Sequence, residues 1–147
     1  MMLQSVCVIS KADLKQAYHM PKVAKQMISE DTLNDIDLMA HIIHHECGAN
    51  WCSDEMRYFT GYVVMNRVNS DLFPNTIYDV IYQPGQYSGA SNLIYETYSD
   101  HIYEIATEIV LGGSQIPENV LFQANFVQGD GVYAQVQNMY FCYKGEL

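Results

Sequence analysis

The sequence predicts an α+β fold that is mainly helical and carries a small antiparallel sheet near its C-terminus. Apolar residues recur at helical spacing in three long segments between residues 35 and 111. After residue 119 the pattern changes to short runs of β-branched and aromatic residues, which are typical of strands. Helices that precede strands along the chain favour the α+β class. Because 49% of the 147 residues are hydrophobic, we expect one packed globular unit.

The N-terminal residues 1–34 are expected to form a helical lead-in to the main domain, residues 35–147. Ser10 is suited to cap one short helix, and Pro21 to occupy the first turn of another. The chain does not start with a basic segment and a continuous apolar stretch, so we expect no secretory signal peptide. No apolar run approaches the roughly 18 residues that a membrane span requires.

Two long helices open the main domain. The first is expected over about 35–47, and Gly48 can end it in a left-handed conformation. Ser53 is expected to cap the second, and Thr76 a short helix, Ile77–Tyr82. The positions predicted to face the core in the two long helices are Ile36, Met39, Ile42, Ile43, Met56, Phe59, Tyr62, Val63 and Val68.

A third long helix and two strands complete the prediction. The helix is expected over about 98–111, before a glycine pair. Its apolar residues recur every three to four positions, and those predicted to face the core are Ile102, Ile105, Ala106, Ile109 and Val110. Strands are expected over Val120–Asn125 and Met139–Tyr143, with a turn at Gly129-Asp130-Gly131 between them.

The charge of the chain excludes two classes of partner. The formal net charge is −10, with only 7 Lys and Arg residues, so neither nucleic acid phosphates nor an anionic membrane surface is an expected partner. A neutral polar polymer such as a glycan fits better. Twelve Tyr and one Trp supply faces suited to stacking on sugars, although most of these rings are expected to lie half-buried in the core.

The four cysteines form no CxxC pair, so a structural zinc site is not expected. The four cysteines allow three disulfide connectivities, and the sequence does not choose among them. Cys47 and Cys52 either close the turn between two helices as a disulfide or stay reduced. Cys7 and Cys142 are expected to be free, buried thiols.

The densest cluster of ionisable side chains is His41-Ile42-Ile43-His44-His45-Glu46-Cys47. Glu46 stands at the end of an apolar helix beside a glycine, where a cleft can open at the edge of the core. Burial there would raise the pKa of its carboxyl group, which is what a general acid requires. The alternative is an ordinary solvated Glu at a helix end.

Two other chemistries compete for this cluster. His41 and His45 share a helix face at the spacing of zinc ligands, and His101 is available as a third. However, the order of His and Glu differs from the metalloprotease motif, so no metal or other cofactor is expected. Cys47 or Cys52 with His101 would make a peptidase dyad, but neither cysteine has glycines on both sides as in nucleophile motifs.

Residues 40–143 resemble the cell wall hydrolase family of spore cortex-lytic enzymes (SleB/CwlJ type). The blocks that carry the resemblance are Ala40-His41-Ile42-Ile43-His44-His45-Glu46, Asn50-Trp51-Cys52-Ser53-Asp54-Glu55-Met56, Val63-Val64-Met65-Asn66-Arg67-Val68, residues 73–88, residues 122–133 and Tyr140-Phe141-Cys142-Tyr143. The resemblance implies a lysozyme-like domain, related to lytic transglycosylases, that cuts peptidoglycan between N-acetylmuramic acid and N-acetylglucosamine. It also implies that Glu46 is the catalytic acid and base.

The walls of the cleft are predicted from side chains suited to sugars. Gln86, Tyr87 and Ser88 in a turn-rich loop, together with Gln123 and Phe126, offer amides and rings for hydroxyl and acetamido groups. Tyr87 and Phe126 would serve equally well as core aromatics.

Two alternatives remain open at this stage. A muramidase would need a second carboxylate, which Asp54 or Glu55 can supply in principle. A non-catalytic peptidoglycan-binding or virion module would keep the fold without the reaction. We expect the protein to reach a bacterial wall or spore cortex through lysis, a holin, spore assembly or virion delivery. The oligomeric state is not predicted.

Overall fold

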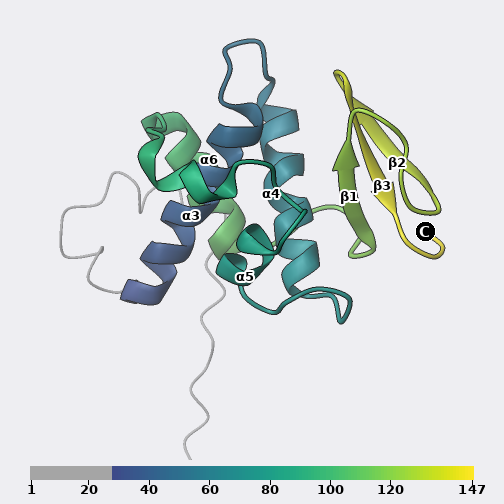
Figure 1. The fold of residues 1–147 in the computed structure, drawn as a ribbon, viewed down its shortest axis with the longest axis horizontal. Helices are drawn as coiled ribbons and strands as arrows, with labels where there is room; N and C mark the ends of the chain where they lie inside the picture. Colours follow the sequence, from purple (N-terminus) through teal and green to yellow (C-terminus); the bar gives the residue numbers. More distant parts are fainter. Residues whose placement is uncertain (1–27) are drawn as a thin grey trace, which may run out of the picture.

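The structure, a computed structural model, describes residues 28–147 (Figure 1). The predictions for Cys7, Ser10 and Pro21 therefore lie outside the described residues. The elements, in chain order, are α3 (Glu30–Cys47), α4 (Asp54–Val68), α5 (Ile77–Tyr82), the 3-10 helix η1 (Ala90–Tyr95), α6 (Asp100–Gly112), β1 (Val120–Ala124), β2 (Gly131–Val136) and β3 (Met139–Tyr143). This order confirms the α+β prediction.

Four helices begin where a hydroxyl side chain accepts a hydrogen bond from the backbone N–H three residues later. The capping residues are Ser29, Ser53, Thr76 and Ser99. The caps at Ser53 and Thr76 confirm the predicted starts of α4 and α5. Helix α3 begins five residues before its predicted start, because Ser29 caps it and its first turn is polar, with no apolar periodicity to reveal it.

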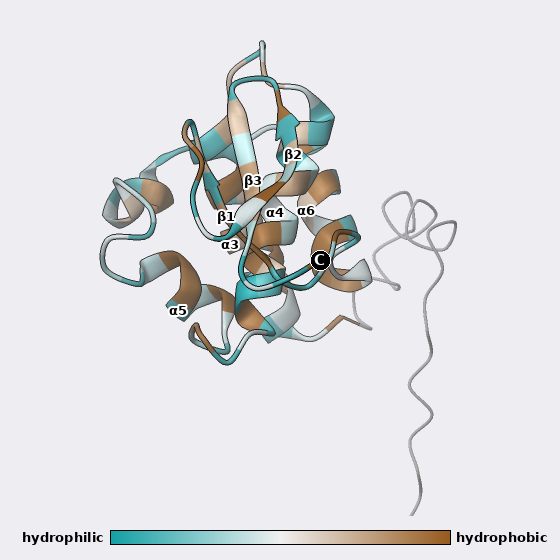
Figure 2. Cartoon of the chain, turned by 90° about the vertical axis from the view of Figure 1, so that its right-hand side faces the viewer, coloured by the Kyte–Doolittle hydropathy of each residue, from teal (hydrophilic) through white to brown (hydrophobic). Residues whose placement is uncertain are grey.

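Helices α3, α4 and α6 pack around one apolar core, and α4 also packs on the sheet. The residues of α3 and α6 predicted to face inward are buried, except for the half-buried Val110. Val64 of α4 joins this core, while Met56 and Val63 join a second cluster with Phe141 of β3. Figures 1 and 2 show the sheet on one side of the helices. Helix α4 is thus the shared wall of two cores.

The sheet is antiparallel with strand order β1-β3-β2. The predicted pair of strands is present, and β2 is an additional strand that was not predicted from the sequence. Its sequence lacks the alternation of apolar and polar residues that marks a half-buried strand. In the structure, most of its residues are exposed or half-buried. A two-residue turn that contains Gln137, at φ 54°, joins β2 to β3. The 3-10 helix η1 was also not predicted.

The expected left-handed conformation of Gly48 is wrong, because its φ is −79°. Glycine is required there for a different reason: a Cβ atom would overlap the carbonyl oxygen of His44 and lie 2.6 Å from its Nδ1. No helix within residues 28–147 is long and apolar enough to cross a membrane.

Candidate active site

Glu46, in the last turn of α3, lines an open groove of about 380 Å³. The groove lies where α3 and the loops after it meet the sheet. Its other lining residues come from four separate parts of the chain: Trp51 and Met56; Gln86 and Ser88; Gln123, Ala124 and Asn125; and Asn138 and Met139. Amides are the commonest side chains among them, so the groove offers donors and acceptors of hydrogen bonds beside one carboxyl group.

Burial raises the pKa of Glu46 above its usual value of 4.5. The charges of His45 and Arg67 oppose this shift, and so does the side chain of Gln123, without cancelling it. The Gln123 amide is a weak partner, since neither of its polar atoms has a well-formed hydrogen bond within residues 28–147. Glu46 therefore favours its neutral, proton-donating form more than an exposed glutamate does.

His45, the residue before Glu46, ties α3 to the opposite wall of the groove. Its Nε2 donates to the carbonyl oxygen of Ser88 at 2.6 Å, and its Nδ1 lies 2.8 Å from Oε1 of Glu96. Two acceptors facing the two ring nitrogens favour the doubly protonated imidazolium. Burial by itself lowers the pKa of His45, but these hydrogen bonds and the charges of Glu96 and Glu46 raise it overall.

Arg67 supplies a buried positive charge near Glu46. It is only 4% exposed, and its Nε donates to the carbonyl oxygen of Leu121 at 2.8 Å. Its guanidinium lies over the rings of Phe73 and Tyr87, 4.9 and 5.4 Å from their centroids. Nη1 has no hydrogen-bond partner among the described residues. The stacking and the Nε hydrogen bond hold the guanidinium in the core, where its charge lowers the pKa of Glu46.

The five predicted binding residues divide into two groups. Gln86, Ser88 and Gln123 line the groove together with Glu46. Tyr87 is 8% exposed and packs in the helical core against Arg67, while Phe126 is 58% exposed and lies outside the groove lining. For Tyr87 the core alternative is therefore the one that the structure supports.

Six of the ten groove-lining residues were not predicted from the sequence, most notably Trp51, Asn125 and Asn138. Asn125 comes two residues after the predicted Gln123, and this proximity was an available signal. Trp51 follows Glu46 by only five residues and is the one tryptophan, so its proximity and residue type were available signals as well. Asn138 carries no local signal, because only the fold brings the β2–β3 turn beside Glu46.

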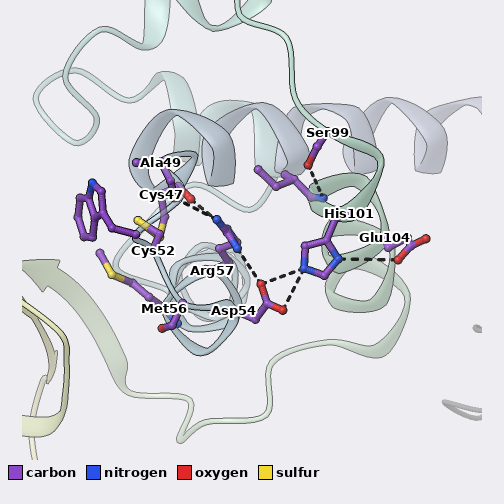
Figure 3. A network of polar contacts seen from close by, with 12 residues as sticks. Cys47, Ala49, Cys52, Asp54, Met56, Arg57, Ser99, His101 and Glu104 are labelled. Carbon is purple, nitrogen blue, oxygen red and sulfur yellow. Dashed lines mark hydrogen bonds and ion pairs between the residues drawn. A yellow bond between two sulfur atoms is a disulfide. The ribbon is translucent and has the colours of Figure 1, made fainter.

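Asp54 and Glu55, the candidates for a second carboxylate, do not line the groove. Asp54 instead contacts Nε2 of His101 at 2.9 Å and Nη1 of Arg57 at 2.7 Å (Figure 3). The hydrogen bond from His101 is the largest cause of a lowered pKa at Asp54. Glu46 is the one acidic residue among the groove-lining residues of the described chain.

The structure also shows where the residues of the two rival chemistries lie. Cys47 and Cys52 form a disulfide, which leaves neither as a thiol nucleophile (Figure 3). Cys142 is free and buried, as predicted. His41 pairs with Asp37 at 3.7 Å, so it and His45 face different acidic partners. Over residues 28–147, no three potential metal ligands converge.

Comparison with known proteins identifies the family. The profile of the family described as Cell Wall Hydrolase matches residues 52–142, which is more than half of the chain. No curated protein and no solved structure matches the chain. The matched segment contains most of the groove lining but begins six residues after Glu46. The chain therefore belongs to the cell wall hydrolase family, which degrades peptidoglycan.

Proposed function

We propose that this protein cleaves the glycan strand of peptidoglycan between N-acetylmuramic acid and N-acetylglucosamine, as a lytic transglycosylase. The observation that carries the proposal is Glu46, a half-buried carboxyl group with a raised pKa in a groove lined by amides. A neutral polar groove fits a glycan, and a neutral carboxyl group fits the protonation of a glycosidic oxygen.

The reaction uses the same carboxyl group twice. Glu46 donates its proton to the glycosidic oxygen as the bond from that oxygen to C1 of muramic acid breaks. The resulting carboxylate then accepts the proton of the C6 hydroxyl of muramic acid, while the C6 oxygen bonds to C1. Glu46 returns to its neutral form, and the product carries a 1,6-anhydro ring.

Two nearby side chains support the charged half of this cycle. Arg67 and His45 both lower the pKa of Glu46, which means that they stabilise its carboxylate. Burial stabilises the neutral form instead. A carboxyl group held between these opposing influences is suited to both giving and taking a proton near its working pH.

The choice of transglycosylase over hydrolase rests on the groove. A hydrolase of this class needs a second carboxylate roughly 5–9 Å from the first, to act as a nucleophile or to activate water. Asp54 is engaged by His101 and Arg57, and neither it nor Glu55 lines the groove. An intramolecular attack by the C6 hydroxyl requires no second carboxylate.

The test is the chemistry of the cut end. Purified peptidoglycan digested with the protein should release muropeptides that end in 1,6-anhydro-muramic acid, each one water lighter than its hydrolysed counterpart by mass spectrometry. Glu46→Gln, incubated in parallel, controls for contaminating hydrolases. Reducing-end muramic acid from the wild type alone would establish hydrolysis and require a second carboxylate. Intact glycan strands in both digests would instead support a binding module.

A further inference from the structure

Trp51, the one tryptophan of the chain, lines the groove beside Glu46 and remains 60% exposed. Leaving a large aromatic side chain in water forfeits the free energy that its burial would supply. Other exposed aromatics exist, such as Tyr95 at 80%, but Tyr95 does not line the groove. An indole at the groove surface is therefore a candidate contact for a ligand.

A disulfide and the side chain of Arg57 hold the backbone of the turn that carries Trp51. The Cys47–Cys52 disulfide closes the turn, and Nε and Nη2 of Arg57 donate to the carbonyl oxygens of Cys47 and Ala49, each at 3.1 Å (Figure 3). The backbone N–H of Cys52 donates to the carbonyl oxygen of Ala49 at 3.0 Å. Trp51 thus stands on a cross-linked turn and not on a free loop, so presenting it costs little conformational entropy on binding.

The sheet adds a second set of bonds to the same turn. Nε2 of Gln137 donates to the carbonyl oxygen of Trp51 at 2.8 Å, and its Oε1 accepts from the backbone N–H of Ser53 at 2.9 Å. Gln137 adopts a positive φ of 54°, which is uncommon for a residue other than glycine. The β2–β3 turn therefore locks the backbone of Trp51 and also places the adjacent Asn138 in the groove lining.

We propose that Trp51 is a stacking platform for one N-acetylhexosamine ring of the glycan strand, with Asn138 and Asn125 binding its polar substituents. This inference rests on the proposed function and names a subsite within it. The apolar C–H face of a pyranose ring packs on an indole, while carboxamides donate to and accept from hydroxyl and acetamido groups. The platform is a binding and positioning element, and the chemistry stays at Glu46.

The single tryptophan makes the test direct. Glu46→Gln is titrated with a soluble tetrasaccharide of alternating N-acetylglucosamine and N-acetylmuramic acid, while tryptophan emission is followed and binding is measured independently by calorimetry. The expected result is a saturable blue shift and protection from iodide quenching, with the same midpoint as the heat signal. Residues 1–147 contain no second indole to confuse the emission.

A kinetic comparison provides the second readout. In the active protein, Trp51→Ala should raise KM for a soluble glycan roughly tenfold, the loss expected for one such contact, with a smaller effect on kcat. Trp51→Phe should recover part of this loss because it keeps an aromatic face. Tyr95→Ala, which removes an exposed aromatic outside the groove, is the matched control and should leave both constants unchanged.

The outcomes separate this inference from the proposed function. Heat of binding without any change in emission would overturn the Trp51 subsite and leave glycan cleavage standing. An unchanged KM in a folded Trp51→Ala would overturn it as well. Absence of binding by calorimetry, together with uncut glycan strands in the wild-type digest, would overturn both.

Discussion

At the scale of single residues, the ionisation of Glu46 is set by burial and by the charged groups around its carboxyl group. Burial raises its pKa, while His45 and Arg67 restrain the increase. Burial comes from the packing of the groove wall, whereas the two charges belong to His45, the preceding residue of α3, and to Arg67 of α4. A reaction that requires a neutral Glu46 should therefore persist above pH 4.5 and decline as the pH rises through the raised pKa.

Replacing Glu46 tests its role directly. Glu46→Gln keeps the size of the side chain but cannot donate the proton, so we expect a loss of at least about 100-fold in the rate of muropeptide release. The melting temperature should change little, and sedimentation with purified walls should be retained. Glu55→Gln, an exposed change outside the groove, is the control and should keep most of the activity. If Glu55→Gln were inactive and Glu46→Gln active, the site would have to be placed on α4.

His45 gives the protein a stability that depends on pH. Its pKa is raised in the folded state, so its stabilising contribution is complete below the unfolded value of about 6.5. The contribution is lost as the pH rises through the higher folded pKa, because deprotonation leaves one of its two acceptors, the Ser88 carbonyl or Glu96, without a donor.

The measurement is urea unfolding of the wild type and of His45→Gln at several pH values between 5.5 and 8.5. We expect the difference in free energy of unfolding to be largest below pH 6.5 and to shrink at higher pH. A difference that stays constant over this range would show that the imidazolium is not what joins α3 to Ser88 and Glu96.

At the scale of elements, close packing of the helices depends on a glycine. Gly61 of α4 faces α3 and α6, and a Cβ atom there would overlap Cδ1 of Ile109 and lie 3.3 Å from Cδ1 of Ile43. Both isoleucines are fully buried and have little room to move. The absence of a side chain at Gly61 therefore allows α4 and α6 to pack closely.

Gly61→Ala should destabilise the protein although alanine favours helices. The gain in helix propensity is about 1 kcal/mol, whereas overpacking a core costs about 1–3 kcal/mol. We expect a lower melting temperature in calorimetry. Gly112→Ala, at the end of α6 with no atom near the added methyl group, is the matched control and should be neutral or stabilising. A stabilised Gly61→Ala would mean that the helices repack without strain.

At the scale of the whole molecule, the groove exists because two structural layers meet. Helix α3 supplies Glu46, the loop after α5 supplies Gln86 and Ser88, and the sheet supplies Gln123 with its flanking turns. Helix α4 joins both cores and holds these layers together. Cleavage of the glycan should therefore be lost whenever the sheet separates from the helices.

We expect the activity to be independent of metal ions, and this expectation rests on how the whole molecule distributes its histidines. Three of the four histidines within residues 28–147 face separate acidic partners: His41 faces Asp37, His45 faces Glu96, and His101 faces Asp54. Nδ1 of the fourth, His44, has no hydrogen-bond partner among the described residues. We expect muropeptide release to be unchanged after dialysis against excess chelator, and unchanged again when zinc is restored. Activity that is lost in chelator and recovered with stoichiometric zinc would refute the mechanism proposed for Glu46.

The sequence by itself determined the elements that depend on local interactions. Hydroxyl caps before α4 and α5, apolar periodicity in α3 and α6, and the patterns of β1 and β3 are each contained within about 15 neighbouring residues. The acid candidate Glu46 was visible from its place at the end of an apolar helix and from the family resemblance. Gln86, Ser88 and Gln123 were visible because their side chains suit sugars. Strand β2 escaped prediction since its pairing with β3, and not its own hydropathy, makes it a strand.

The tertiary structure alone decided which side chains meet. Tyr87 and Ser88 are adjacent in the sequence, yet one is buried against Arg67 and the other lines the groove. The Cys47–Cys52 pairing, which the sequence left open, requires the approach of α3 to the start of α4. Trp51 reaches its place through Gln137, 86 residues away. A contact between residues as far apart as Gln137 and Trp51 depends on how the sheet packs against the helices, so no local pattern encodes it.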